Sequence, residues 1–386
     1  MAESGFTLDR VPRIVQAPGA ITRIGEIAHR LGGGAPALLV ADPGLAALGL
    51  IDRALGALRD AQLHAAVFSD LKSDPTCASI DAAAALARRE GAGVVVALGG
   101  GSALDVGKAA AAIAPADRPA ADYALCARPL PPRPLPILAV PTTSGTGSEA
   151  TRTAIASLPD GAKIWLWGDE MKPAETVLDP ELTVPLPPDL TATTGIDALI
   201  HALEATTNAR AFAANDVFCL EAIRLVARHL PRAVAEPGDL EARAGVQLAA
   251  CLAGIAIDNA GTAIAHNIGH ALASLRPIHH GRAVGLATLA TLPWNAAEDP
   301  DGRFAAVAEA MDAERDAAAL PDAFEHLLRG VGIKVSLAGE GYDDVSADRL
   351  AAQMAAPENA PMRDANHRTV SDDDLHRFAR RVLEQA

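Results

Sequence analysis

Two pairs of residues in the second half of the chain have the side chains and the spacing of a metal site. Asp197 and His201 are four residues apart, and so are His266 and His270. Residues at this spacing lie on one face of a helix, so each predicted helix can direct two donor groups toward a common point. His280 follows ten residues after His270. A carboxylate with several imidazoles suits Fe²⁺ or Zn²⁺, whereas Ca²⁺ and Mg²⁺ prefer oxygen ligands.

The alternative interpretation of these histidines is structural. A single histidine on an apolar helix is more often a hydrogen-bonded core residue than a metal ligand. Here the histidines are clustered and accompanied by an aspartate, which favours the metal site. Spacing alone leaves both interpretations open.

A glycine-rich segment in the first half lies between a predicted strand and a predicted helix and consists of Gly99, Gly100, Gly101 and Ser102. Its backbone N–H groups and the positive end of the helix dipole can bind a pyrophosphate. The segment is not the ordinary dinucleotide fingerprint, because Leu104 stands where the third glycine belongs, and its glycine spacing is not that of a Walker loop. Taken alone, a tight turn without a ligand is an equal alternative.

A second segment strengthens the nucleotide hypothesis. It follows the apolar run 135–140, and its hydroxyl groups include those of Thr142, Thr143 and Thr146. Two such loops at the carboxyl ends of parallel strands form the crevice in which open α/β sheets bind nucleotides. Asp42, at the end of an earlier run, is placed to accept hydrogen bonds from an adenosine ribose. A carboxylate there would repel a 2′-phosphate and so favours NAD over NADP, although an ordinary turn aspartate is the alternative.

The elements that must position these residues are of two kinds. In the first half, short apolar runs alternate with predicted helices: the runs span 37–40, 65–68, 94–98 and 135–140, and the helices span 50–58, 80–89 and 104–113. Uninterrupted runs of this length are typical of strands buried on both faces of a parallel sheet. The first half is therefore predicted to be α/β.

After residue 180 the strand signals stop and helical periodicity takes over. Apolar residues recur at three- and four-residue spacing across 217–230 and 244–255. Asp189, which follows a cluster of prolines, is the predicted N-cap of the first helix. We expect an α/β dinucleotide-binding domain over residues 1–187 and an all-helical metal-binding catalytic domain over residues 188–386.

The composition excludes several classes of function. Of the 386 residues 50% are hydrophobic and only 3% aromatic, and the formal net charge is −15. A nucleic-acid partner would require basic patches and stacking rings. The longest uncharged apolar run, 244–257, is shorter than the roughly 20 residues of a membrane span, so no membrane is expected. Four separated cysteines without a CxxC pair, and no visible secretory signal, favour a cytoplasmic protein.

Four segments together resemble the iron-containing alcohol dehydrogenase family. They are Gly-Gly-Gly-Ser-Ala-Leu-Asp-Val-Gly-Lys at 99–108, Pro-Thr-Thr-Ser-Gly-Thr-Gly-Ser-Glu-Ala-Thr at 141–151, Gly-Ile-Asp-Ala-Leu-Ile-His-Ala-Leu-Glu-Ala at 195–205, and the histidine-rich run 266–281. They occur in the family's order and span most of the chain. The resemblance implies a Rossmann-like N-terminal domain and an all-α C-terminal domain, the architecture shared with dehydroquinate synthase, with the active site in the cleft between them. It also implies an NAD-linked alcohol dehydrogenase or aldehyde reductase for a small primary alcohol or aldehyde, assembled as a homodimer or larger homo-oligomer.

The resemblance further assigns roles to individual residues. The metal, Fe²⁺ with Zn²⁺ as the alternative, corresponds to the ligands Asp197, His201, His266 and His280. His270 is then not a ligand but a catalytic residue beside the nicotinamide, suited to relay the released proton. The cofactor contacts correspond to Asp42, Asp74, Gly99, Gly100, Gly101, Ser102, Asp105, Thr142, Thr143, Thr146, Lys163, Leu182 and His270.

Three positions depart from the family pattern. His279 stands where the family usually has proline, which makes it an alternative donor. Asp74 stands where asparagine is common. Ile257, beside Asp258, stands where many members have an aromatic residue on the substrate side, so the resemblance does not extend to the identity of the substrate.

Two rival functions also follow from these residues. One is an NAD- and metal-dependent lyase resembling dehydroquinate synthase, whose polyanionic substrate calls for several cations, whereas segments 195–205 and 264–281 contain only Arg276 among lysines and arginines. The other is a non-catalytic NAD-binding protein with a structural metal, because structural sites are closed by four protein ligands and four are predicted. His270, an extra titratable group with no structural need, argues against this second rival.

Overall fold

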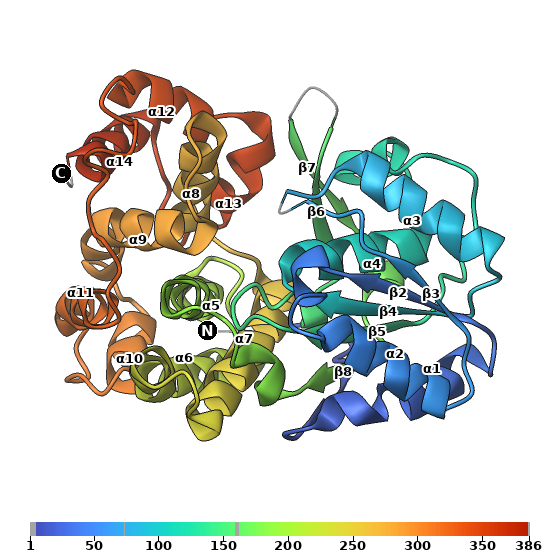
Figure 1. Cartoon of the computed structure of the whole chain (residues 1–386). Helices are drawn as coiled ribbons and strands as arrows, with labels where there is room; N and C mark the ends of the chain where they lie inside the picture. The colour runs from blue at the N-terminus through green and yellow to red at the C-terminus, as the bar shows by residue number, and fades with distance from the viewer. Residues whose placement is uncertain (1–4, 73, 159–161, 385–386) are drawn as a thin grey trace. The chain divides into compact units, whose positions relative to one another are not determined.

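The computed structural model describes residues 5–72, 74–158 and 162–384. The chain forms two compact units, one of residues 10–186 and the other of residues 187–384 with residues 5–9. Among the described residues, the first unit contains every strand and the second contains only helices and loops (Figure 1).

The α/β unit is built on a six-stranded sheet in which all neighbouring strands run parallel. From one edge to the other its strands are β1 (Arg13–Gln16), β8 (Glu175–Leu178), β5 (Ile137–Pro141), β4 (Val94–Gly99), β2 (Ala37–Ala41) and β3 (Ala65–Phe68). A separate antiparallel pair consists of β6 (Thr153–Ser157) and β7 (Lys163–Trp167). The parallel α/β sheet predicted from the apolar runs is thus confirmed.

Helices cover both faces of this sheet. One face carries α1 (Ile24–Gly32) and α2 (Leu50–Asp60), and the other carries α3 (Cys77–Arg89) and α4 (Gly101–Ile113) (Figure 1). Within β2, Leu38 and Val40 pack with α3 and α4, whereas Leu39 packs with α1 and α2. Since successive strand residues point to opposite faces, coverage of both faces explains why the whole strand is apolar.

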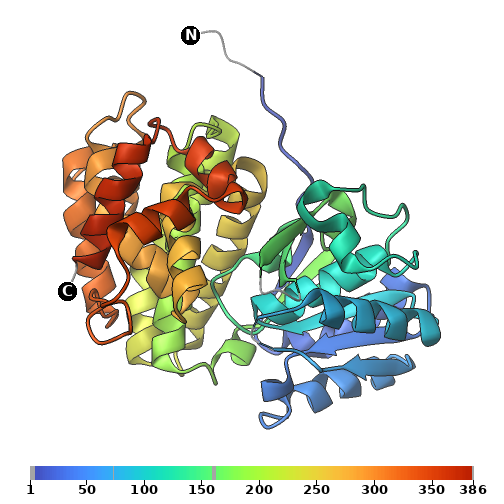
Figure 2. The ribbon, with the colours of Figure 1, turned by 90° about the horizontal axis from the view of Figure 1, so that it is seen from above.

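The second unit is helical throughout. Its helices are α5 (Pro188–Thr207), α6 (Ala213–Ala235), α7 (Leu240–Ala260), α8 (Ile264–Leu275), α9 (His280–Ala296), α10 (Arg303–Ala310), α11 (Leu320–Gly330), α12 (Ala347–Met354), α13 (Ala360–Ala365) and α14 (Asp372–Leu383). Helix α5 packs against α6, α7 and α9, and α8 packs against α9. The C-terminal helices α12 and α14, red in Figure 2, lie against α8 and α9. The predicted helical half is confirmed.

The start of α5 differs from the prediction. The helix begins at Pro188 with Pro187 in the cap position, so Asp189 lies in the first turn and is not the N-cap. Proline is favoured at the first helical position because its missing N–H would have had no partner there. A carboxylate in the first turn still interacts favourably with the helix dipole.

Helix α7 is the most apolar long helix of the described chain. By length and composition alone it could cross a membrane. However, 61% of its apolar stretch is buried inside the helical unit, where it packs against α5 and α6. This is the environment of a core helix, and the burial explains the apolar composition.

Candidate metal centre and nucleotide site

Three buried side chains of the helical unit bring their donor atoms within 4.8 Å of one another. They are Asp197 and His201 on α5 and His266 on α8. Oδ1 of Asp197 lies 3.8 Å from Nε2 of His201 and 3.6 Å from Nε2 of His266. The two imidazole rings are stacked, with centroids 4.6 Å apart. The four-residue spacing that predicted a shared face of α5 therefore directs both α5 side chains to the same point as His266.

His280, the first residue of α9, brings a fourth donor to this point. Its Nε2 lies 3.6 Å from Oδ1 of Asp197, and its side chain is 38% exposed. The following Gly281 makes this approach sterically feasible, because a Cβ atom there would lie 1.9 Å from the carbonyl oxygen of Thr193. The glycine lets the start of α9 lie against α5, and His280 consequently sits beside Asp197.

The cluster has the dimensions and the chemistry of a site for a small divalent cation. Tetrahedral coordination with bonds of about 2.1 Å separates neighbouring donors by about 3.4 Å, close to the 3.6–3.8 Å between Asp197 and the three imidazoles. Oδ1 of Asp197 and Nε2 of His266 are buried and form no hydrogen bond with the described residues. Buried polar atoms are rarely left this way, and a bound cation would satisfy both.

The charges around Asp197 favour a cation as well. Burial alone would raise the pKa of Asp197, but the imidazoles of His201 and His280 hold it well below its usual range. Burial alone would lower the pKa of His266, but the carboxylates of Glu204 and Asp197 raise it to about 9. The carboxylates of Asp197 and Glu204 thus favour positive charge on His266, whereas burial lowers the pKa of His280 to about 4 and keeps its imidazole neutral, the form that binds a metal.

Glu204 also contributes to this cluster, although it is not among the residues predicted from the sequence. Its carboxylate Oε2 lies 2.6 Å from Nδ1 of His266. Glu204 follows Asp197 by seven residues and His201 by three, so all three lie on one face of α5. That spacing is the signal in the sequence that could have revealed it.

His270 and His279 border the cluster without joining the three-residue group. His270 lies one turn after His266 and is partly exposed. Its ring centroid is 5.2 Å from that of His280 and 6.4 Å from that of His266. His279 is exposed and precedes the first turn of α9.

In the α/β unit, predicted cofactor residues gather where three neighbouring strands end. The backbone N–H of Asp42, after β2, donates to the carbonyl of Leu98 on β4, and that of Thr142, after β5, donates to the carbonyl of Gly99. One carboxylate oxygen of Asp42, Oδ1, accepts from the N–H of Gly44 at 2.8 Å. The strand ends thus place Asp42 and both glycine-rich loops at one edge of the sheet.

The two glycine-rich loops pack closely because glycines of the first loop face threonines of the second. A Cβ atom on Gly100 would lie 3.2 Å from Cγ2 of Thr143, and one on Gly101 would lie 2.8 Å from Cγ2 of Thr146. Helix α4 begins at Gly101, with Ser102 in its first turn, and has no side-chain hydrogen bond at its N-cap. The N–H groups of this helix start are suited to bind a phosphate group.

Other predicted cofactor residues have protein partners of their own. Asp105 accepts hydrogen bonds from Oγ of Ser148 at 2.5 Å and from the N–H of Ile155 at 2.9 Å. These bonds use both carboxylate oxygens to connect α4 with the loop after β5 and with β6. Asp105 therefore holds the loops together, whatever contact it makes with a cofactor.

Asp74 and Lys163 are brought together by an ion pair of 2.8 Å, and Asp74 also accepts from Oγ of Ser157. Both side chains are about half exposed. Leu182, by contrast, is buried in the core beneath α1 and α2, so its side chain serves packing.

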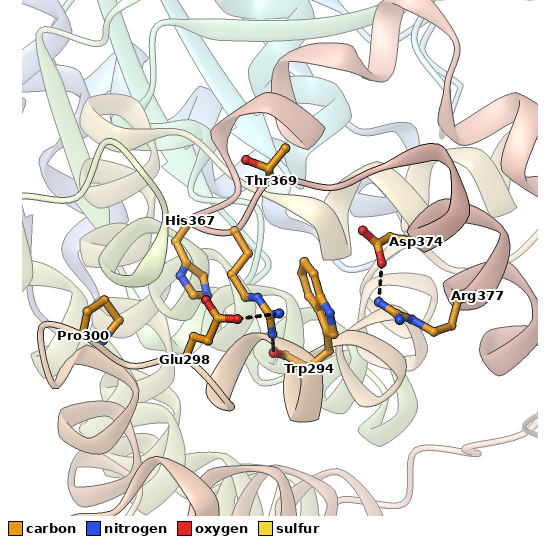
Figure 3. A pocket seen from close by; sticks show the side chains of 8 residues that line it. Trp294, Glu298, Pro300, His367, Thr369, Asp374 and Arg377 are labelled. Atoms are coloured by element: carbon orange, nitrogen blue, oxygen red, sulfur yellow. Dashed lines mark hydrogen bonds and ion pairs between the residues drawn. The ribbon is translucent and has the colours of Figure 1, made fainter.

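A polar pocket of about 590 Å³ on the helical unit contains none of the predicted site residues (Figure 3). Its arginines are already engaged: Arg368 pairs with Glu298 at 2.7 Å and lies over the ring of Trp294, and Arg377 pairs with Asp374. These interactions leave no cation in the pocket without a partner, and we assign it no role.

Both halves of the chain match known protein families. Residues 12–180 match the model described as iron-containing alcohol dehydrogenase. Residues 191–383 match the model described as the C-terminal region of the Fe-containing alcohol dehydrogenase family. Together the two matches cover most of the sequence.

Individual relatives are similar over most of the chain. The 4-hydroxybutyrate dehydrogenase of Cupriavidus necator is 33% identical over 380 residues, covering 95% of this chain and 96% of the relative. The 1,3-propanediol dehydrogenase of Klebsiella pneumoniae is 35% identical over 320 residues, covering 81% of each chain. The crystal structure of sulfoacetaldehyde reductase from Bifidobacterium kashiwanohense in complex with NAD⁺ superposes with a TM-score of 0.89 at 30% identity, covering 98% of this chain and 99% of that one.

Proposed function

This chain belongs to the iron-containing alcohol dehydrogenase family, and from that premise we propose which of its residues perform the reaction. It is an NAD-linked alcohol dehydrogenase, which in the reverse direction reduces an aldehyde. In our proposal Asp197, His201, His266 and His280 hold Fe²⁺. The two glycine-rich loops of the α/β unit bind NAD. The lyase is not favoured, because the relatives are dehydrogenases and reductases.

The observation that supports the metal assignment best is the convergence on Oδ1 of Asp197. Three Nε2 atoms from three helices lie 3.6–3.8 Å from that single oxygen. Hydrogen bonding does not account for this convergence, since Nε2 of His266 and Oδ1 of Asp197 have no hydrogen-bond partner among the described residues. When bound, the metal supplies a Lewis acid that polarises the oxygen of the substrate, and NAD supplies the hydride acceptor.

The remaining tasks fall to the chain's own residues, which bind the metal and the cofactor and transfer the alcohol proton. The four donors would hold the metal, and the N–H groups at the start of α4 would hold the phosphates of the cofactor. His270 is partly exposed and one turn from His266. We assign its imidazole the transfer of the alcohol proton toward solvent, because imidazole side chains commonly act as proton carriers in catalysis.

The substrate is proposed to be a small primary alcohol or the corresponding aldehyde. The names of the relatives support this class, since 1,3-propanediol and 4-hydroxybutyrate are primary alcohols and sulfoacetaldehyde is an aldehyde. We further propose a cytoplasmic homodimer or larger homo-oligomer. The four cysteines are all free thiols, as is usual in a reducing compartment.

The decisive experiment measures metal-dependent turnover. Protein purified without oxygen is stripped of metal, reloaded separately with Fe²⁺ or Zn²⁺, and given NAD⁺ with short primary alcohols and diols, or NADH with the corresponding aldehydes. NADH absorbance reports turnover, and titration of NAD reports cofactor binding. We expect turnover only in reloaded protein, and the rates with Fe²⁺ and Zn²⁺ compare the two metals.

A matched pair of variants links this activity to the proposed ligands. His266→Ala removes a ligand, whereas His326→Ala removes an exposed histidine of α11. The first variant should lose metal and turnover, and the second should keep both. Full turnover in metal-free protein would overturn the metal assignment, and a failure to bind NAD would overturn the cofactor assignment.

A further inference from the structure

Glu204 connects two features of the helical unit, the start of α8 and the imidazole of His266. Its side chain is 5% exposed. Oε1 accepts from the backbone N–H of Ala265 at 2.7 Å, and Oε2 accepts from that of Ala263 at 2.8 Å. Oε2 also lies 2.6 Å from Nδ1 of His266. A carboxylate of α5 thus binds three donors at the beginning of a helix 60 residues further along the chain.

Both oxygens of the Glu204 carboxylate already accept hydrogen bonds from these donors, so we do not count Glu204 as a fifth metal ligand. Helix α8 begins at Ile264 without a side-chain bond from its own N-cap residue, and the N–H groups at a helix start need such an acceptor. The negative charge is also favourable at that end of the helix dipole. This part of the contact is structural.

The contact with His266 does more than satisfy a donor. The two ring nitrogens of His266 face two carboxylates of the same helix, Nδ1 facing Glu204 and Nε2 facing Asp197. A histidine binds a metal through the ring nitrogen that carries no proton. The hydrogen-bond partner of the other nitrogen determines which of the two is unprotonated. With Glu204 accepting from Nδ1–H, the nitrogen left for a metal is Nε2, which points at the other donors.

We propose that Glu204 is a positioning residue that holds the imidazole of His266 with Nε2 directed at the metal. The proposal rests on the proposed function, because His266 is a ligand only if the cluster binds metal. A carboxylate bound to the distal nitrogen of a ligating histidine fixes the orientation of the ring and makes the ligand more basic. Glu204 thereby contributes to metal affinity without touching the metal.

The test compares the zinc affinity of Glu204→Gln with that of the wild type. Glutamine has the same shape but no charge, and it offers one acceptor oxygen where the carboxylate offers two. Zinc dissociation constants are measured by competition with a chelator at fixed pH, and thermal unfolding is recorded with and without zinc. We expect zinc affinity to fall roughly 10–100-fold and the thermal stabilisation by zinc to shrink.

Asp239→Asn is the matched control, because Asp239 also caps a helix of this unit by accepting from the N–H of Ala242 at 3.0 Å. Its other partner is Arg232, which is not one of the four proposed ligands. Its replacement should therefore lower stability equally with and without zinc and leave zinc affinity unchanged. If Glu204→Gln behaves in the same way, Glu204 only caps α8 and the proposal is wrong.

Further measurements distinguish a failure of the Glu204 proposal from a failure of the metal assignment and from misfolding of a variant. If the wild type itself does not bind zinc, the metal assignment fails before Glu204 is tested. Glu204→Asp keeps the charge but places it one methylene further from His266. This variant replaces Glu204→Gln in the test if the glutamine variant does not fold. A zinc affinity equal to that of the wild type would again overturn the proposal. With Co²⁺ as the probe, a change in the visible absorption bands of either variant is expected, because the orientation of a ligand has changed.

Discussion

Gly281 and Thr193 lie so close together that a Cβ atom on Gly281 would be 1.9 Å from the carbonyl oxygen of Thr193. This contact joins the first turn of α9 to α5. Gly281 follows His280 directly, and Thr193 precedes Asp197 by four residues. The same Cβ would lie 3.2 Å from Cβ of Asp197. Backbone atoms cannot rotate aside as a side chain can, so the distance between two proposed ligands depends on the absence of one methyl group.

Gly281→Ala should therefore damage both the packing and the metal site. The methyl group must push α9 away from α5, which we expect to lower the free energy of unfolding by at least about 2 kcal/mol and to reduce bound zinc. Gly285→Ala on the same helix is the control, because its Cβ would meet only side-chain atoms, at 3.3 Å and beyond. Urea unfolding and the zinc content per chain measure the two effects. A Gly281 variant with full zinc content would contradict this account of the glycine.

Single histidine replacements should separate ligands from the proton-transfer residue. His266→Ala and His280→Ala should each lose metal and turnover together, because each removes a proposed ligand. His270→Ala should keep its metal and lose about 10²–10⁴-fold in rate, the range attributed to general acid–base catalysis. Elemental analysis and NADH absorbance give the two readouts. Loss of metal from the His270 variant would show that its role is assigned wrongly.

The fold was predictable where burial produces uninterrupted apolar sequence. The runs leading to β2, β3, β4 and β5 are of this kind. The edge strand β1 has only two apolar residues, and β8 contains Glu175 and Thr176, whose burial depends on partners elsewhere. Glu175 pairs with Arg30 at 2.5 Å, a contact between residues 145 positions apart. The residues near such a strand do not reveal that it is buried, because the charge that pairs with its buried glutamate lies far away in the sequence.

The start of α4 was predicted three residues too late for a related reason. Gly101 is a poor helix former, and the segment containing it is typical of a turn. In the structure it begins the helix, since its place against Thr146 leaves little room for a side chain. Tertiary packing there outweighs local propensity.

The candidate site was predictable to the extent that its geometry is local. The four-residue spacing of Asp197 and His201 specifies a shared helix face from sequence alone. The contact between Glu204 and His266 joins residues 62 positions apart, and only the folded helical unit shows it. The placement of Leu182 in the core is likewise a matter of tertiary packing.

Asp42 should determine the choice between NAD and NADP. Its carboxylate lies at the end of β2 beside the first glycine-rich loop, where it would repel a 2′-phosphate. Asp42→Ser removes the charge and keeps a small polar group that can accept from the N–H of Gly44. We expect kcat/KM for NADP⁺ relative to NAD⁺ to rise at least about tenfold, equivalent to about 1.4 kcal/mol.

The matched control is Asp52→Ser, which removes an exposed negative charge from α2 of the same unit. Initial rates with both cofactors at one ionic strength give the comparison. If the two variants change the preference equally, the effect belongs to the net charge of the unit and Asp42 does not face the ribose.

Glu149 makes the stability of the α/β unit depend on pH. The residue is 2% exposed, and its Oε1 has no hydrogen-bond partner among the described residues. Burial raises its pKa from the ordinary 4.5 to about 7, against the opposing effects of its backbone hydrogen bond and of the charge on Lys108. A raised pKa in the folded state means that the contribution to stability is fully present below pH 4.5 and is lost as the pH rises through about 7.

Glu149→Gln removes this dependence, because the neutral amide has nothing to ionise. At pH 8 the variant should exceed the wild type in free energy of unfolding by up to about 3 kcal/mol, and at pH 4.5 the two should converge. Urea unfolding at intervals between these values measures the difference, with Glu26→Gln, an exposed residue of α1, as the control. Parallel curves for the wild type and the Glu149 variant would mean that the buried carboxylate has found a compensating partner, since its ionisation would then cost the fold nothing.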